Sequence, residues 1–305
     1  MNFDSERFDD FVEGFAMPQV GHGGVEIPAP KDFRWPGGRR VGVIFRVALE
    51  GWSDGKWPGA GPMGNPLKPG TVDLNAVYWA EYGPRCGVHR LLDILERHAV
   101  RATVLVNGII TERYPDAVRR VAAAGHEIVA HSYAMDIIPA YLTEEEEKEN
   151  IRCTTEAIQK VCGVTPRGWI SPRATPSVHT ARLLAEAGYE WHGDYLNDDL
   201  PYQIRFGDRV IIAAPGSMEV NDMPMYVRYG NPPRAMIEVF EDTLAALLKG
   251  EPGAGKIDVT AHAHVFGRPS GAWAFERMIE IAKSNPEIWI GTRGDLATQL
   301  RSTGV

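Results

Sequence analysis

The feature that most constrains the fold is a regular alternation between short apolar, β-branched runs and longer amphipathic segments. The apolar runs have the length of buried strands and lie at 41–49, 102–106, 127–130, 168–171, 189–194, 210–214, 257–262 and 288–291. The segments with helical character lie between them, at 85–98, 115–124, 143–162, 176–187, 234–248 and 273–284. Alternating strands and helices pack as a parallel sheet or barrel covered by outer helices. The sequence therefore predicts an α/β protein.

Two stretches rich in glycine and proline interrupt this alternation, at 1–40 and 51–70. We predict that residues 1–40 form an irregular N-terminal arm and that residues 41–305 form one domain, because no change of composition divides the rest of the chain. A loop as long as 51–70 is usually functional or disordered. Its tryptophans, Trp52 and Trp57, would suit the covering of a flat ring.

Composition excludes several classes of partner. The chain of 305 residues carries a formal net charge of −8 and shows no basic stripe, so neither nucleic acid nor an anionic membrane is expected to bind. No apolar run reaches the roughly 18 residues of a membrane helix. The three cysteines have no metal-ligand spacing, and the acidic N-terminus lacks the apolar stretch of a secretory signal. These patterns predict reduced thiols and a cytoplasmic protein.

Two histidines, His131 and His262, each stand at the end of a predicted strand, and Glu50 follows the first strand. Side chains at the carboxyl ends of parallel strands meet at one rim of a barrel. An acid and two histidines there suit proton transfer, so we predict that Glu50, His131 and His262 are catalytic. Each also has a structural explanation, since a strand-end histidine can simply hydrogen-bond a loop. The chain lacks a glycine-rich phosphate loop and a GxSxG nucleophile motif.

Further polar residues fall at the same predicted rim. Four are expected to bind substrate, namely Trp52, Arg173, Asp199 and Asn221. Asp199 could equally belong to a turn, and Arg173 could pair with a surface carboxylate. His264 would face the same side as His262 in an extended segment, but two histidines are too few for a metal site, and we expect that this spacing arose by chance.

Several of these segments resemble the polysaccharide deacetylase superfamily. GHEIVAHSYAMD (125–136) is similar to its histidine motif, and HVFGRPSG (264–271), after His262, is similar to its C-terminal histidine motif. The strings GWISPRATPS, DYLNDDLPY and VNDMP resemble those of the allantoinase-like and cyclic-imide-hydrolase-like branch. The resemblance extends over residues 41–296 and implies a distorted (β/α) barrel in a single domain. It also implies a homo-oligomer.

The departures from the superfamily pattern concern its metal ligands. The resemblance implies an Asp-Asp pair at the end of the first strand, where this chain has FRVALEGW, and a second histidine where it has Met135. A thioether is a poor ligand for a hard or borderline divalent ion. We therefore expect a degenerate metal site and no required cofactor. If zinc does bind, the expected ligands are His131 and Asp136.

The resemblance implies a hydrolase of carbon–nitrogen bonds other than peptide bonds. Our main hypothesis is the opening of a small cyclic amide, imide or ureide, with His262 as general acid and Glu50 or His131 as general base. One alternative is a metal-dependent N-deacetylase of an acetylated sugar or peptidoglycan, with the metal held by His131, Asp136 and Glu50. The other alternative is a catalytically inactive binding protein on the same fold. The sequence does not decide which residue is the base, since pKa depends on burial.

Overall fold

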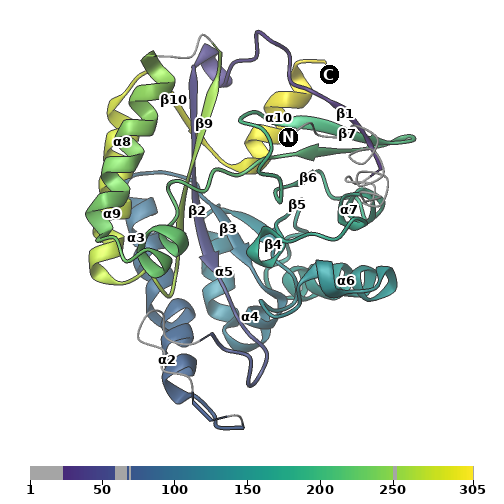
Figure 1. Ribbon diagram of the computed structural model, residues 1–305, viewed down its shortest axis with the longest axis vertical. Helices are drawn as coiled ribbons and strands as arrows, with labels where there is room; N and C mark the ends of the chain where they lie inside the picture. Colours follow the sequence, from purple (N-terminus) through teal and green to yellow (C-terminus); the bar gives the residue numbers. More distant parts are fainter. Residues whose placement is uncertain (1–22, 59–66, 69, 250–252, 305) are drawn as a thin grey trace, which may run out of the picture.

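The computed structural model describes residues 23–58, 67–68, 70–249 and 253–304. A strongly curved sheet lies at the centre, with helices around it (Figure 1). Its strands run in the order β1 (Val25–Ile27), β7 (Tyr202–Phe206), β8 (Arg209–Ala213), β6 (Trp191–His192), β5 (Gly168–Trp169), β4 (Glu127–Ala130), β3 (Thr103–Val106), β2 (Val41–Leu49) and β10 (Ile288–Gly291). β9 (Gly255–His262) pairs with β2 as well. All pairings are parallel except β1 with β7 and β7 with β8.

Strand β2 is the centre of the sheet, and all nine of its residues are buried. Along one side it pairs with β9 at eight consecutive positions, and its other side pairs first with β10 and then with β3. Because these strands are parallel, the ends of β2, β3, β4 and β9 all lie at the rim toward which the β2 arrow points in Figure 1. This arrangement is the one that the strand-end prediction requires.

The barrel is distorted because hydrogen bonds between the described strands do not close it. No strand pairing joins β8 to β9 in the described chain. Residues 220–221 approach β9 instead, through a bridge between Asn221 and Thr260 and one hydrogen bond from the Thr260 amide to the Val220 carbonyl (2.9 Å). The predicted α/β architecture with a distorted barrel is therefore confirmed, with one open side.

The predicted helices are present, with shifted bounds. The α-helices are α2 (Leu74–Tyr82), α3 (Val88–Arg97), α4 (Gly108–Arg113), α5 (Pro115–Ala123), α6 (Glu144–Cys162), α7 (Thr180–Glu186), α8 (Pro233–Lys249), α9 (Pro269–Ser284) and α10 (Arg293–Ser302). Short helical turns occur at η1 (Pro36–Gly38), η4 (Pro139–Tyr141) and η5 (Pro172–Ala174), and π-helices at η3 (Gly83–Gly87) and η6 (Met223–Arg228). The capping box predicted at Thr143 and Glu146 begins α6.

The differences in helix bounds have local causes. The segment predicted as 85–98 contains the end of η3 followed by α3. The segment predicted as 176–187 becomes helical only at Thr180, because the Ser177 hydroxyl first accepts the amides of His179 and Thr180 in a turn. Helix α2 was not predicted, since it buries only two alanines and has no apolar stripe that a sequence pattern could show.

The described part of the predicted arm, from residue 23, packs on the barrel, whereas residues 1–22 lie outside the described residues. Trp35 is fully buried. Its ring stacks on Trp289 (centroids 5.3 Å apart), and its Nε1 donates to the Gly255 carbonyl at 2.7 Å. Gly42 of β2 makes room for this ring, because a Cβ there would meet it at 2.7 Å. The domain boundary at residue 41 stays a prediction.

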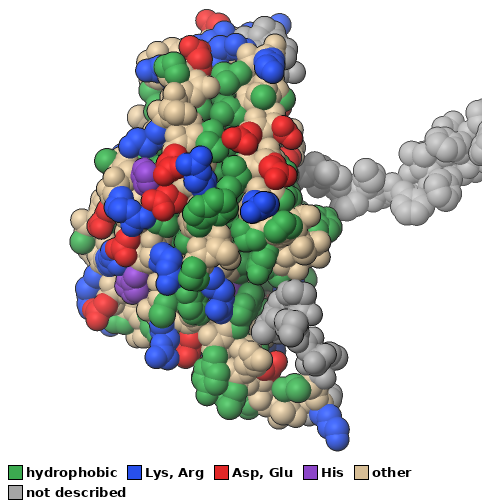
Figure 2. All heavy atoms as spheres, turned by 90° about the vertical axis from the view of Figure 1, so that its left-hand side faces the viewer, with side chains coloured by type: hydrophobic (Ala, Val, Ile, Leu, Met, Phe, Trp, Pro, Cys, Tyr) green, Lys and Arg blue, Asp and Glu red, His purple; other side chains and the backbone are tan. Residues whose placement is uncertain are grey.

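The outer surface shows mixed charge. On the side that carries α3, α8 and α9, acidic and basic side chains are interspersed with apolar ones (Figure 2). Within the described residues, no helix is both long and apolar enough to cross a membrane.

We predict that Trp35→Ala lowers the free energy of unfolding by about 3–5 kcal/mol, because it leaves a cavity and an unpaired carbonyl under the barrel. Urea denaturation measures this change. Trp273→Ala is the matched control, since Trp273 is 49% exposed on α9. Equal losses for the two variants would contradict the anchoring role of Trp35.

Candidate active site

The carboxylate of Glu50 lies among three histidines at the rim of the barrel. Its Oε1 is 3.4 Å from Nε2 of His262 and 3.8 Å from Nε2 of His131, and its Oε2 is 3.9 Å from Nδ1 of His264. All four side chains are buried. The register between β2 and β9 explains the meeting, since Ala48 is directly opposite His262 and Glu50 follows two residues later on the same face. The structure thus brings together all three residues predicted to be catalytic.

Asp222 fixes the orientation of His262. One carboxylate oxygen of Asp222 lies 2.5 Å from His262 Nδ1, and the other accepts the backbone amides of His262 (2.8 Å) and Phe266 (3.2 Å). Nδ1 therefore carries a proton, and Nε2 is left to face Glu50. Burial alone would lower the pKa of His262, but the charges of Asp222 and Glu50 outweigh it and raise this pKa to about 10.

Glu50 carries the negative charge that faces His262. Burial would raise the pKa of its carboxyl, but the charge of His262 and hydrogen bonding from His131 and His262 hold it well below its ordinary value. At neutral pH the site therefore holds a carboxylate beside an imidazolium. A base that is already ionised and an acid that is already protonated stand 3.4 Å apart.

His131 is oriented by a backbone carbonyl. Its Nδ1 lies 2.5 Å from the carbonyl oxygen of Ile170, which can only accept, so Nδ1 carries a proton and Nε2 faces Glu50 Oε1 at 3.8 Å. Asn107, at the end of β3, holds this corner by donating to the carbonyls of His131 and Ser132 and accepting the amide of Gly51.

His264 belongs to the same cluster, contrary to our expectation of a chance spacing. As predicted, it faces the same side as His262, because both approach Glu50. The rings of Trp52 and Trp79 make T-shaped contacts with the His264 ring, and their centroids lie 5.4 and 4.4 Å from its centroid. Burial, supported by the charges of His262 and Arg268, lowers its pKa to about 4 against the effect of Glu50. His264 is therefore neutral. The unpredicted helix α2, which carries Trp79, is the reason that its burial was not foreseen.

The four residues expected to bind substrate are placed differently from one another. Trp52 lies at the cluster beside His264. Asn221 is buried, but its side-chain oxygen accepts the Met223 amide at 3.0 Å and shapes a turn. Arg173 and Asp199 are exposed, and no contact of the described chain joins either to Glu50. Their substrate roles stay predictions.

A small cavity of about 40 Å³ adjoins Glu50. Its walls come from the loop after β2, from α2, from η3 and from the end of α4. They are formed by Gly51, Trp52, Trp57, Ala80, Glu81, Pro84, Ile110, Arg113 and Tyr114. It has room for one or a few water-sized groups. The Oε2 atom of Glu50 is buried and has no hydrogen-bond partner, which leaves a free acceptor at this cavity.

Two glycines bring η3 against the segment that carries the histidines. A Cβ at Gly87 would meet the carbonyl oxygen of Ala263 at 1.8 Å, and one at Gly267 would meet the same oxygen at 2.0 Å. The backbones therefore touch directly, and the wall of the cavity is fixed relative to His262 and His264.

Among the described residues, the barrel rim does not supply three donors close enough to one another to hold a metal ion. Glu50 and His131 offer two, and the position implied for another histidine is Met135. Asp136 Oδ1 accepts the amide of Ser53 at 2.9 Å and forms no close three-donor group with Glu50 and His131. The residues thus do not fit a three-residue metal site, and we derive no catalytic step through a metal.

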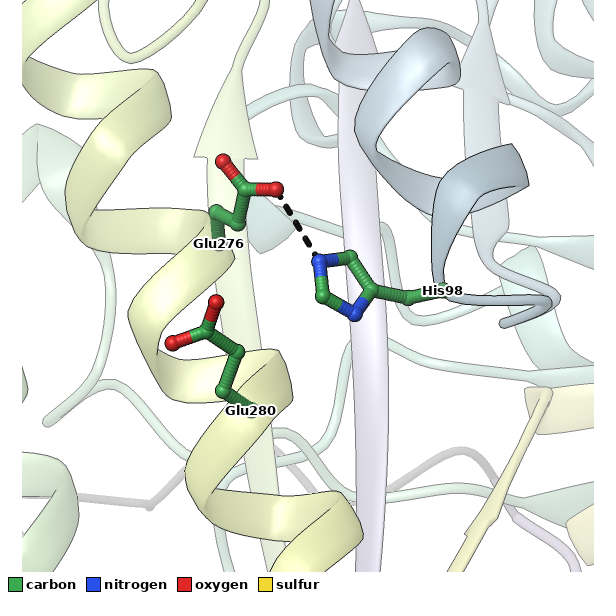
Figure 3. Close-up of side chains that lie close together, drawn as sticks. All are labelled: His98, Glu276 and Glu280. Atoms are coloured by element: carbon green, nitrogen blue, oxygen red, sulfur yellow. Dashed lines mark hydrogen bonds and ion pairs between the residues drawn. The ribbon is translucent and has the colours of Figure 1, made fainter.

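One close group of three donors does occur in the described chain, on the outer surface. It consists of His98 and two glutamates of α9, Glu276 and Glu280 (Figure 3). Glu276 already pairs with His98 Nε2 (3.0 Å) and with Arg97 (2.8 Å). This group is explained as an ordinary surface ion-pair cluster.

Comparison with known proteins agrees with this architecture. Residues 79–192 match the family model described as Polysaccharide deacetylase. A Schizosaccharomyces pombe protein that is provisionally named a polysaccharide deacetylase is 29% identical over 294 residues, covering 86% of this chain and 91% of that protein. Peptidoglycan deacetylase from Helicobacter pylori is 30% identical over 123 residues, covering 40% of this chain and 42% of its own length.

Solved structures are also similar. The Puue allantoinase structure matches with a TM-score of 0.81 and 28% identity, over 94% of this chain and 98% of that one. A Pseudomonas aeruginosa structure, provisionally named a polysaccharide deacetylase, matches with a TM-score of 0.81 and 27% identity over the same shares.

These matches place the chain among proteins with an α/β barrel of the polysaccharide deacetylase type. Residues 79–192 match the polysaccharide deacetylase domain, and most of the chain is similar to proteins named after that family. Homologues in the family are hydrolases of carbon–nitrogen bonds other than peptide bonds, and the predicted enzyme class is confirmed at this level.

We predict a loss of stability at alkaline pH that depends on His262. Its ordinary pKa is 6.5 and its folded pKa is about 10, so the stabilisation by its charge is complete below pH 6.5 and is lost as the pH rises through 10. Urea denaturation between pH 6 and 10 should show this fall in wild type and a smaller fall in His262→Gln. Parallel profiles for the two proteins would contradict it.

Proposed function

We propose that this protein hydrolyses an amide-type carbon–nitrogen bond by acid–base catalysis at Glu50 and His262. The observation that supports the proposal is the buried pair of a carboxylate and an imidazolium 3.4 Å apart, with Asp222 behind the imidazolium. Each group is in the protonation state that its task needs.

The reaction follows from these positions. Glu50 takes a proton from a water molecule, and the hydroxide attacks the substrate carbonyl to give a tetrahedral intermediate. His262 Nε2 donates its proton to the leaving nitrogen while Asp222 stabilises the ring. The bond to nitrogen breaks, giving a carboxylic acid and an amine or amide nitrogen. The proton on Glu50 then returns to His262 across the short gap, which restores both groups.

We further propose that the substrate is a small cyclic amide, imide or ureide. A carbonyl in an imide or between nitrogens is more electrophilic than a simple amide, so it needs less help from a Lewis acid, which suits a rim with Met135 in the place of a ligand. The cavity beside Glu50 is small, and Trp52 and Trp57 could lie against a flat ring. The overall likeness to the Puue allantoinase structure supports this substrate class.

The second candidate is removal of an acetyl group from an amino sugar. It is favoured by the names of the relatives, which more often refer to polysaccharide or peptidoglycan deacetylation than to ring opening. Deacetylases of the family are generally metal-dependent. Of the ligands expected for such an ion, the described chain brings only Glu50 and His131 together, so this candidate would need a further ligand.

A substrate panel decides between these candidates. Chelator-treated protein is incubated with allantoin, hydantoin, succinimide and an N-acetylglucosamine oligomer. Base uptake at constant pH reports opening of the rings, whereas released acetate is assayed directly for the oligomer, because the free amine takes up the proton of the acid. We expect turnover of a cyclic substrate without added metal. Turnover of the acetylated oligomer alone, or only after zinc is added, would replace the ring-opening proposal with deacetylation.

We predict that Glu50→Gln and His262→Gln each lower kcat by about 10²–10⁴-fold on the best substrate of that panel, because each removes one proton-transfer group. Glu127→Gln is the matched control, since this half-buried carboxylate accepts hydrogen bonds from Thr103 and Trp191 at the start of β4, away from the rim. A Glu50→Gln enzyme as active as the Glu127→Gln control would exclude Glu50 as the base.

A further inference from the structure

The open side of the barrel contains a buried ion cluster. Asp258, on β9, accepts Lys256 Nζ at 2.6 Å and lies 2.9 Å from Arg293 Nη2. These side chains are enclosed in the barrel interior. Burial opposes ionisation of Asp258, but Arg293, Lys256 and Arg46 hold its pKa well below the ordinary value. The proposed chemistry at the rim uses none of these four residues.

The cluster holds the segment 214–222, which continues from β8 toward the active site. Arg293 donates to the carbonyl of Ala214. The Ser217 amide donates to Asp258 Oδ2, and the Asp258 amide donates to the Ser217 hydroxyl, both at 2.9 Å. In a closed barrel, backbone hydrogen bonds would join this segment to β9 as a neighbouring strand. Here bonds that involve the side chains of Asp258 and Ser217 join the two instead.

The same segment ends at Asp222, the partner of His262. Between Ser217 and Asp222, one backbone hydrogen bond, from Thr260 to Val220, ties it to β9. Met218 and Glu219 in between are exposed. The reciprocal pair of Asp258 and Ser217 therefore fixes the register of the segment against β9 at its near end, and the bridge at Thr260 continues that register toward the Asp222 carboxylate.

We propose that Asp258 and Ser217 are positioning residues, which fix Asp222 against His262 by holding segment 214–222 in the place of a missing barrel strand. Arg293 and Lys256 keep Asp258 ionised and oriented for this task. Only the effect on rate rests on the proposed function, since the positioning itself can be measured without substrate.

The first variant is Ser217→Ala, which removes the hydroxyl that accepts the Asp258 amide and leaves every charge in place. In protein with ¹⁵N-labelled histidine, the downfield proton of His262 Nδ1, identified by its loss in His262→Gln, reports the bond to Asp222. We expect this resonance to broaden or move upfield, and Ser217→Thr to restore it. Asp258→Asn should have a larger effect; if it does not fold, Ser217→Ala still provides the test.

The control is Ser177→Ala, because Ser177 also accepts two backbone amides, but between α6 and α7. An unchanged His262 resonance in folded Ser217→Ala, or an equal change in Ser177→Ala, would overturn the proposal. On a substrate that the panel identifies, kcat should fall roughly tenfold or more while KM changes little, as expected for a misplaced catalytic group. If wild type turns over no panel substrate, the proposed function fails, while the resonance still tests the positioning.

Discussion

The parallel pairing of β2 with β9 is the constraint on which the rest of the site depends. Eight consecutive residue pairs fix the register, and a slip by one residue would turn either Glu50 or His262 away from the barrel interior. The apolar alternate residues of β2, such as Val47 and Leu49, belong to the core under the helices, so the same register that buries the core also brings Glu50 and His262, the proposed catalytic pair, together. Folding and active-site assembly are one event here.

Removing a carboxylate and an imidazole from water is unfavourable, and such a pair gives little net stability. The arrangement is therefore better understood through its chemistry. The positive charge opposite Glu50 belongs to the imidazolium of His262, whose Nδ1 is held by Asp222. The proton on Nε2 can therefore be transferred to a leaving group, whereas a charge held on Arg or Lys would stay with the protein. The third histidine, neutral His264, encloses the pair without competing for that proton.

Sequence alone could predict Glu50, His131 and His262, because strand periodicity and strand ends are local patterns. It could not assign Asp222 its role, because that role depends on the contact with His262. His262 lies forty positions later on β9, and a local sequence pattern does not show that the segment of Asp222 lies beside that strand. It also predicted Arg173 and Asp199 at the rim, but both side chains are exposed, because loop conformation, including the left-handed φ of 58° at Arg173, decides where such side chains point. Helix α2 was missed for lack of an apolar stripe, and the burial of His264 was missed with it.

The direct contact of Gly87 with the segment 263–267 has a consequence for the range of substrates that this barrel can accept. Neither glycine can exchange for a larger residue without separating η3 from the histidines, so that wall cannot change by side-chain replacement. Helix α2 contributes Ala80 and Glu81 to the same cavity through their side chains, which can be exchanged for larger or smaller ones. Changes in the size of the cavity are therefore expected on α2 and the loop beside it, while the wall at Gly87 stays rigid.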